Sequence, residues 1–419
     1  MDTERVVDLS SVRTRFPGLR RTQDGRPVVF ADAPGGTQVP RSVIDAVTDY
    51  LANWNANLGG AFATSARSDA LLAEAHASAA AFLGADPDEV VIGQNTTTIA
   101  LHLSRSFART IGPGDEVVVT VLDHDANVTP WVRAAEDAGA SVRRVDVHPE
   151  DGTLDLDSLD AALSERTRLV AFALASNALG TITPADDIVH RARGAGALVV
   201  ADGVHLAPHV SIDARALGVD LLFTSPYKYF GPHLGAAFGR RELLERWVPY
   251  KVRPAPDALP DRWETGTLSH EALAGLVAAV EYVASVGSEF GEPGGDGLRA
   301  LVTAGMRAIT AYEGSLSRRF LAGLSAIPAL TLWGVAEPDR WTERTPTFAL
   351  RLDGVHPRAL AEELGRRGVF VWDGNYYALS IMERLGLEES GGATRVGFCH
   401  YNTPDEVDRV LAELADIAG

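Results

Sequence analysis

The stretch LLFTSPYK, residues 221–228, runs from apolar residues into a lysine and is followed by YFGPHLGAAFG. An apolar start of this kind is typical of a strand that is buried on both faces of a sheet. Lys228 at its end is unusual, because burial disfavours the charged form of a lysine and lowers its pKa. A lysine with a lowered pKa is nucleophilic enough to form a Schiff base. A lysine that extends from a strand end into solvent is the ordinary alternative and stays open.

Three further apolar runs share this pattern: EVVVTVLDH (116–124), RLVAFALAS (168–176) and ALVVADG (197–203). Helical periodicity lies between the runs, which predicts a mostly parallel sheet with crossover helices. Open α/β sheets bind ligands at the carboxyl ends of their strands. We therefore expect a functional site formed by the polar residues that end these runs: His124, Ser176, Asn177, Asp202, Ser225 and Lys228.

The chain is long enough for a large domain and a smaller one. The segment SEFGEPGGDG (288–297) is rich in glycine and acidic residues and interrupts the strand–helix pattern. After it, the pattern predicts a compact α+β unit. We predict an N-terminal segment at 1–30 that packs on the small domain, a large domain at 31–290 and a small C-terminal domain at 291–419.

The net charge is −18, which argues against nucleic-acid or anionic membrane partners and is typical of a solvated acidic surface. Cys399 is the single cysteine, so an intrachain disulfide is excluded and a reducing compartment fits. Residues 1–16 lack the apolar region of a secretory signal. The run ALAGLVAAV (272–280) is bounded by glutamates, and no uncharged stretch approaches the length of a membrane span. These features predict a cytoplasmic protein.

Two further segments fit a pyridoxal 5'-phosphate (PLP) site, which needs a lysine, an acid at the pyridine nitrogen and an anchor for the phosphate. Asp202 closes a buried strand and needs a cationic partner, which a pyridinium would supply. A helix N-cap is the alternative role for Asp202. In GQNTTTIALHL (93–103), Asn95 and Thr96 offer hydroxyl, amide and backbone N–H groups to a phosphate. A plain helix cap is the alternative there too.

The order and spacing of several motifs resemble the class V aminotransferase fold, and within it the branch of cysteine desulfurases and selenocysteine lyases. The motifs are LDHDANVTPW (122–131), SNALGT (176–181), ADGVH (201–205), TSPYKYFGP (224–232), WETGTLSHEAL (263–273) and TRVGFCHYNT (394–403). The resemblance implies the α/β fold of type I PLP-dependent transferases, with a mostly parallel sheet in the large domain and a smaller α+β C-terminal domain. It also implies PLP as the cofactor and a homodimer with shared active sites, and it implies no metal.

The resemblance assigns roles residue by residue. Lys228 would be the Schiff-base lysine and proton shuttle, Asp202 would bind the pyridine nitrogen, and His124 would stack on the ring. Phosphate binding is implied for Asn95, Thr96, Ser225 and Tyr227, and for Thr267 across the dimer interface. Asn177 and His205 would contact the ring oxygen or the substrate. Arg395 would bind the substrate carboxylate.

The sequence departs from the family where desulfurases carry a nucleophilic cysteine. Their Gly-His-His-Cys-like run is matched by WDGNYYAL (372–379), which places Tyr377 at the cysteine position. Tyrosine cannot take sulfur as a persulfide. Cys399 precedes YNT in an expected core strand, so we interpret it as a structural buried cysteine.

Three further departures affect the pocket. His205 replaces the usual glutamine, and Tyr227 replaces the histidine before the lysine. Trp372, with Tyr376 and Tyr377, predicts an aromatic wall that suits a bulkier, partly flat substrate that Tyr377 helps to bind. A packed core of the small domain would contain the same residues and stays open as an alternative.

These features together predict a PLP-dependent β-eliminating lyase, a carbon–sulfur lyase that acts on a cysteine conjugate or its sulfoxide. Arg395 would hold the α-carboxylate, and Lys228 would remove the α-proton. Tyr227 or His124 would serve as general acid for the leaving group. The alternatives are an aminotransferase or epimerase of the same fold, a cysteine desulfurase, or a non-catalytic protein of this fold.

Overall fold

The computed structural model describes residues 7–419; the start of the predicted N-terminal segment, residues 1–6, lies outside them. A seven-stranded sheet has the order β4-β10-β9-β8-β7-β5-β6, and β10 runs antiparallel to both of its neighbours, whereas the strands from β9 to β6 pair in parallel. The strands are β4 (Val90–Gly93), β5 (Glu116–Thr120), β6 (Ser141–Val145), β7 (Thr167–Ala173), β8 (Leu198–Asp202), β9 (Leu221–Thr224) and β10 (Gly235–Gly239). The predicted mostly parallel sheet is confirmed.

Both faces of the sheet are buried, which explains why its strands are nearly continuous apolar runs. In β5, Val118 packs into one hydrophobic cluster, whereas Val117 and Val119 pack into a second cluster on the other face. The second cluster includes side chains of α3 (Thr96–Ala108) and α4 (Thr129–Ala138). The first includes side chains of α2 (Ala63–Leu83), α6 (Ala185–Gly194), α9 (His270–Phe290) and α10 (Leu298–Leu324).

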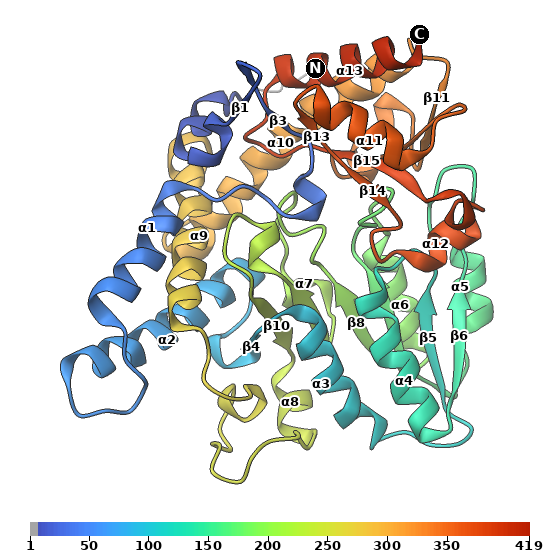
Figure 1. Cartoon of the computed structure of the whole chain (residues 1–419). Helices are drawn as coiled ribbons and strands as arrows, with labels where there is room; N and C mark the ends of the chain where they lie inside the picture. Colours follow the sequence, from blue (N-terminus) through green and yellow to red (C-terminus); the bar gives the residue numbers. More distant parts are fainter. Residues whose placement is uncertain (1–6) are drawn as a thin grey trace.

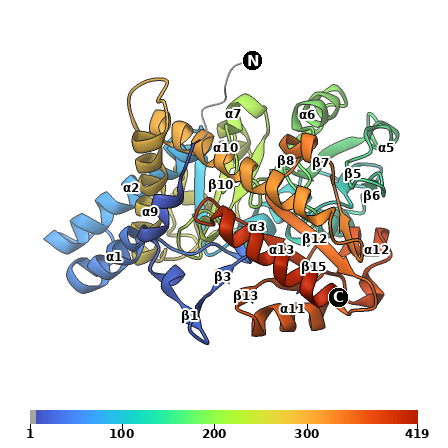
Figure 2. The ribbon, with the colours of Figure 1, turned by 90° about the horizontal axis from the view of Figure 1, so that it is seen from above.

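The C-terminal part of the chain forms a separate antiparallel sheet in the order β11-β12-β15-β14 above the large sheet (Figure 1). Its strands are β11 (Leu330–Trp333), β12 (Thr347–Leu352), β14 (Trp372–Gly374) and β15 (Ala393–Gly397). Helix α11 (Pro357–Arg366) packs against β12, β14 and β15, and α13 (Pro404–Ala418) packs against α10 (Figure 2). This arrangement is the α+β unit that the sequence predicts.

The N-terminal segment lies against the C-terminal unit. β3 (Val29–Phe30) pairs in parallel with β13 (Val369–Phe370). Arg13 donates to the carbonyl of Tyr401 at 3.0 Å and forms an ion pair with Glu406 at 2.7 Å. The two predicted boundaries, at 30/31 and 290/291, stay predictions.

Three predicted strands extend too far toward their carboxyl ends. β5 ends at Thr120 instead of residue 124, β7 at Ala173 instead of 176, and β9 at Thr224 instead of 228. After β9, Pro226 has no N–H to donate to a neighbouring strand, and residues 226–228 form a 3-10 turn. The polar residues therefore lie in loops at the sheet edge, where their side chains are free to converge.

Among the described residues, α9 is the one helix that is long and apolar enough to cross a membrane by length and composition, although glutamates interrupt its apolar stretch as the sequence shows. Within its apolar window, 61% of the residues are buried. The helix packs against α1 (Arg41–Asp49), α2 and α10. This packing accounts for the apolar composition of α9.

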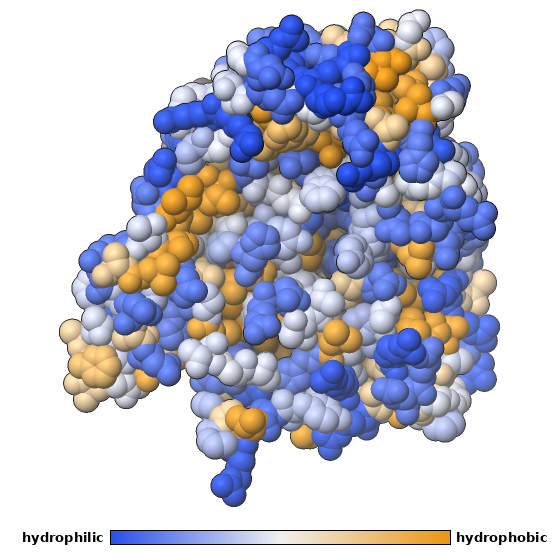
Figure 3. Space-filling view, in the orientation of Figure 1, coloured by the Kyte–Doolittle hydropathy of each residue, from blue (hydrophilic) through white to orange (hydrophobic). Residues whose placement is uncertain are grey.

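Large apolar side chains are exposed on one flank, over α1 and the residues that follow it (Figure 3). The exposed set comprises Ile44, Leu51, Trp54, Leu58 and Phe62. Val248, Tyr250 and Val252 are also exposed, on a separate loop beside the end of α3. Contiguous exposed apolar patches mark sites where proteins associate.

Candidate active site

A cavity of about 980 Å³ lies where the carboxyl ends of β5, β7, β8 and β9 meet the segment that follows β14. Ser176, which the sequence also predicts for the site, does not line the cavity, because its hydroxyl accepts from the N–H groups of Ala178 and Leu179. The cavity brings together eleven of the twelve side chains that the sequence predicts for catalysis or for binding of cofactor or substrate. They are Asn95, Thr96, His124, Asn177, Asp202, His205, Ser225, Tyr227, Lys228, Tyr377 and Arg395. The twelfth, Thr267, lies on an exposed loop before α9 and does not line the cavity of its own chain.

Lys228 ends the 3-10 turn after β9 and points its amine into the cavity wall. The Nζ atom donates to the carbonyl of Pro34 and lies 5.0 Å from the ring centroid of Tyr227. Burial lowers the pKa of Lys228 to about 7; the charge of Arg395 adds to the decrease, and Asp202 opposes it. The amine is therefore partly uncharged at neutral pH, as a nucleophilic lysine requires. The alternative of a lysine that extends into solvent is wrong.

Asp202 ends β8, and its Oδ1 atom accepts a hydrogen bond from the N–H of Val204 at 2.8 Å. It does not cap a helix, because the next helix, α7, begins only at Ala214. Within residues 7–419, no lysine or arginine forms an ion pair with Asp202, and burial raises its pKa to about 6. A buried carboxylate in this state suits a cationic pyridine N–H.

The N-terminus of α3 forms another part of the wall. The Oδ1 atom of Asn95 accepts from the N–H of Thr98 at 2.8 Å, so this side chain is the helix cap. The backbone N–H groups of Thr96 and Thr97 lie in the first turn, where they have no partner in the helix and can bind a phosphate. The Thr96 and Ser225 hydroxyls lie 2.5 Å apart and join α3 to the end of β9.

His124 follows β5 and faces the cavity with a fixed protonation pattern. Its Nδ1 atom accepts from the N–H of Ala126 at 3.0 Å, so the neutral ring carries its proton on Nε2. Burial lowers the pKa of His124 to about 4, and the charge of Lys228 contributes. The ring lies nearly parallel to that of Tyr377, with centroids 5.6 Å apart and an interplanar angle of 16°.

Arg395, on β15, is held from two sides. Its Nη1 atom donates to the carbonyl of Asn177 at 2.7 Å, and its guanidinium lies 4.1 Å from the ring centroid of Tyr376. The Asn177 amide donates in turn to the carbonyl of Tyr376 at 2.9 Å. Burial lowers the pKa of Arg395 to about 10, so it stays charged at neutral pH. The Nε atom has no partner, which leaves donor capacity for a substrate carboxylate.

The sequence analysis missed two buried acids behind these residues. Asp123 accepts from the Thr120 hydroxyl and from the Asn127 amide, and so fixes the loop that carries His124. Burial raises the pKa of Asp123 to about 7. Burial also raises the pKa of Asp32, to about 6, and the charge of Arg395 opposes this shift. The one available signal was the position of Asp123 beside His124 at a strand end.

His205 is fully buried, and its Nε2 atom contacts the Thr345 hydroxyl at 3.1 Å. Its ring meets that of His209 edge to face. His209 is bonded to Glu313 of α10 at 2.7 Å, and Glu313 also accepts from the N–H of His400. A buried polar network therefore holds His205 in place at the back of the cavity.

The remaining predictions have mixed outcomes. Cys399 is fully buried, but it lies beyond the end of β15 rather than in a strand, because its N–H donates to the Asn402 side chain in a turn. Trp372 and Tyr377 are 50% and 74% exposed, so the alternative of a packed core is wrong for both residues. They lie at the mouth of the cavity.

A model of the aminotransferase class-V family matches residues 29–292 and 294–410. The chain belongs to this family. It is 34% identical to a cysteine desulfurase of Synechococcus elongatus over 98% of its own length and 64% of that protein, so it spans less than two thirds of this relative. It is 32% identical to a cysteine desulfurase of Dickeya dadantii over 97% of its own length and 96% of that protein.

The fold is also that of solved structures. A cysteine desulfurase from Thermococcus onnurineus superposes with a TM-score of 0.86 at 24% identity, covering 100% of this chain and 99% of the other. A cysteine desulfurase from Escherichia coli superposes with a TM-score of 0.82 at 24% identity, covering 99% of each chain. The predicted type I fold and family are confirmed, and the chain is a PLP-dependent enzyme. Lys228, Asp202 and the N-terminus of α3 fit the aldehyde, the pyridine nitrogen and the phosphate of PLP.

The lowered pKa of Lys228 has a measurable consequence. The chain has two lysines, Lys228 and Lys251, so a Lys251→Arg variant leaves one lysine to follow. In the PLP-free variant, we expect acylation of Lys228, measured by peptide mass spectrometry, to rise with pH around a midpoint of about 7. The uncharged amine is the reactive form, and its fraction grows as pH passes the pKa. A midpoint near that of an ordinary lysine, about 10.4, would contradict the account.

Proposed function

We propose that this enzyme is a β-eliminating lyase that acts on a cysteine conjugate or its sulfoxide. Addition of water and loss of the sulfur substituent would give pyruvate, ammonia and a thiol, or a sulfenic acid from the sulfoxide. One observation carries the proposal: the residue that covers His124 is Tyr377, and the single thiol of the chain, Cys399, is fully buried and does not line the cavity.

The residues of the cavity divide the work. Arg395 binds the α-carboxylate through its free donors, and Asn177 and Tyr376 orient the guanidinium. Lys228 accepts the α-proton as an uncharged amine, a state that its lowered pKa makes accessible at neutral pH. Bound PLP, held by Asp202 at the pyridine nitrogen, supplies an electron sink for the carbanion.

Tyr227 is a better general acid for the departing sulfur than His124. Burial and the charge of Asp202 raise the pKa of Tyr227, so its phenol keeps its proton at neutral pH. His124 is a neutral ring whose pKa of about 4 leaves little imidazolium to donate. The Tyr227 ring centroid also lies 5.0 Å from the Lys228 Nζ atom, which is the base in the proposed reaction.

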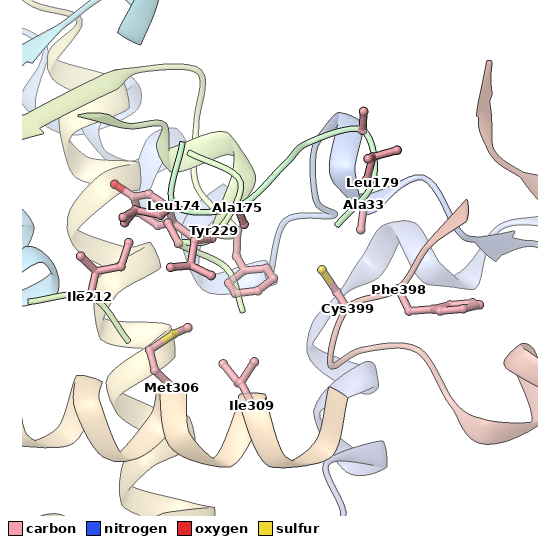
Figure 4. Packing of buried hydrophobic residues seen from close by; sticks show 14 of the residues in the cluster. Ala33, Leu174, Ala175, Leu179, Ile212, Tyr229, Met306, Ile309, Phe398 and Cys399 are labelled. Atoms are coloured by element: carbon pink, nitrogen blue, oxygen red, sulfur yellow. The ribbon is translucent and has the colours of Figure 1, made fainter. Parts of the chain in front are cut away.

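Desulfuration of free cysteine is the second candidate, because the relatives named above are cysteine desulfurases. A persulfide mechanism needs an accessible thiolate. Cys399 belongs to the same buried hydrophobic cluster as Ile309 and Phe398 (Figure 4), and its sulfur lies within 4.8 Å of side-chain atoms of His209 and Glu313. Burial and the nearby charge of Glu313 raise the pKa of Cys399 well above its usual value. Both features oppose a role for Cys399 as the sulfur acceptor.

The products distinguish the two reactions, since β-elimination gives pyruvate and desulfuration gives alanine. With an S-alkylcysteine and its sulfoxide, we expect the holoenzyme to release pyruvate and ammonia in equal amounts and no alanine. The Cys399→Ala variant should retain this activity. Tyr227→Phe should lower kcat by about 10²–10⁴, the usual contribution of a general acid. Alanine production from cysteine that is lost in Cys399→Ala would contradict the proposal, as would transfer of the amino group to an added keto acid.

We also propose that the enzyme is a cytoplasmic homodimer. The exposed apolar residues over α1 form a surface that a second copy would bury. Thr267 is exposed and absent from its own cavity, which suits a residue that serves the phosphate of the partner's site.

Sedimentation equilibrium tests the dimer. We expect a dimer for the wild type and a shift toward monomer for Phe62→Asp, because a carboxylate would replace an apolar ring that is 58% exposed in the single chain. Glu389→Gln is the control, because it changes an exposed polar residue that is far in sequence from this surface. It should leave the dimer intact. A wild-type monomer with full PLP content would contradict the dimer.

A further inference from the structure

The outer wall of the active-site cavity carries three acidic side chains that the proposed reaction does not use: Asp125, Asp373 and Glu388. Among residues 7–419, the inner wall carries one lysine and one arginine, Lys228 and Arg395, together with the buried carboxyl of Asp202. The mouth of the cavity is therefore anionic, and Arg395 at the inner end is the charged cation that can bind the α-carboxylate.

All three acids are connected to one short segment, residues 375–377. Glu388 accepts from the Asn375 amide at 3.0 and 3.2 Å, and Asn375 accepts from the N–H of Tyr377 at 3.1 Å. The carbonyl of Tyr377 accepts from the N–H of Asp125 at 2.7 Å. Asp373 lies on β14, two residues before Asn375. Glu388 thus contacts the segment that covers His124 through its carboxylate, Asp125 contacts it through its backbone, and Asp373 lies beside it in the chain.

Protein cations compensate this charge poorly. Asp125 is bonded to the Thr129 hydroxyl at 2.7 Å, and Glu388 to a neutral amide. Asp373 has one cationic partner, Arg358, at 3.3 Å. Arg358 is 65% exposed and also pairs with Glu362 at 2.8 Å, so its attraction for Asp373 is weak. The three acids are themselves only partly exposed, where charge interactions are stronger than in bulk water.

Two aromatic rings complete the mouth. Trp372 and Tyr377 are exposed and line the same cavity as the acids. Trp372 is fixed against Gly35, where a Cβ atom would come within 2.1 Å of the indole Nε1. Tyr376 and Tyr377 both have positive φ angles, 56° and 59°, a strained backbone that their contacts to Asn177 and Asp125 hold in place. Faces of Trp and Tyr rings attract cations.

We propose that the substrate side chain ends in a cationic group, such as an ammonium, guanidinium or imidazolium, which binds between these acids and rings. The α-carboxylate would bind to Arg395 at the other end of the cavity. A second carboxylate at the distal end would be repelled, which disfavours conjugates with acidic tails. The identity of this group as the leaving substituent rests on the proposed β-elimination, but the charge preference of the mouth does not.

Binding of three amino acids without a sulfur leaving group tests this preference independently of the reaction. Lysine, norleucine and 2-aminoadipate place a cationic, a neutral and an anionic end at similar distances from the α-carbon. Their dissociation constants can be measured from the change in absorbance of PLP bound to the holoenzyme. We expect lysine to bind about 10-fold more tightly than norleucine, and 2-aminoadipate about 10-fold less tightly, with differences that shrink at high salt. Equal affinities, or no binding of lysine, would overturn the proposal.

A pair of variants assigns the preference to the mouth. In an Asp125→Asn, Glu388→Gln double variant, the ratio of lysine to norleucine affinity should fall from about 10 to near 1. Glu389→Gln is the matched control, because Glu389 is the exposed neighbour of Glu388 and does not line the cavity. It should leave the ratio unchanged; an equal fall in both variants would overturn the proposal.

Turnover separates this inference from the proposed function. S-(2-aminoethyl)cysteine carries the cation and a sulfur leaving group, and S-propylcysteine is its neutral counterpart. Preferential binding of lysine without pyruvate release from either conjugate would contradict the β-elimination and leave the charge preference standing. Pyruvate release at equal kcat/KM from both conjugates, together with equal binding of lysine and norleucine, would contradict the charge preference and leave the β-elimination standing.

Discussion

The burial of the Lys228 amine at the end of β9 is the constraint on which the rest of the site depends. Taking a lysine out of water costs free energy, and the protein offsets the cost by lowering the pKa rather than by forming an ion pair. Asp202 lies buried at the end of the neighbouring strand without a cationic bond of its own. A sheet buried on both faces makes this possible, since it brings the strand ends together at one edge, where they line the cavity.

The C-terminal unit completes that environment. Arg395 comes from β15, and its charge contributes to the low pKa of Lys228. The segment 375–377 reaches the strand ends through the bonds that Tyr376 and Tyr377 accept from Asn177 and Asp125. The same contacts that close the cavity therefore set its charge distribution. The position of this unit on the sheet therefore determines both the surroundings of Lys228 at the inner end and the side chains at the mouth.

The sequence predicted most of this site because the apolar runs end in the residues that matter. His124, Asn177, Asp202 and Lys228 each follow a strand, and parallel strands bring such ends to one edge. Strand lengths were overestimated because a run of apolar letters does not reveal where hydrogen bonding between strands stops, as at Pro226. Asn95 proved to be a helix cap, an alternative that local sequence could not separate from a phosphate ligand.

Other features could not be predicted, since they depend on contacts between distant segments. The environment of Arg395 joins residues 32, 177 and 376, and nothing in the local sequence near β15 indicates these partners. Asp123 is one letter from His124, yet only its burial shows that it fixes the loop. Tyr377 was singled out through family resemblance, and the structure adds the stacking on His124 and the exposed mouth.

Reduction of the PLP-bound protein with borohydride, followed by peptide mass mapping, tests the central claim most directly. With two lysines in the chain, the outcome is close to binary. The account predicts that the added mass of reduced PLP is found on the peptide with Lys228 and not on the peptide with Lys251. It also predicts the same result in Lys251→Arg and no labelled peptide in Lys228→Ala. PLP mass on Lys251, or labelling that survives in Lys228→Ala, would contradict the assignment of Lys228 and the site built around it.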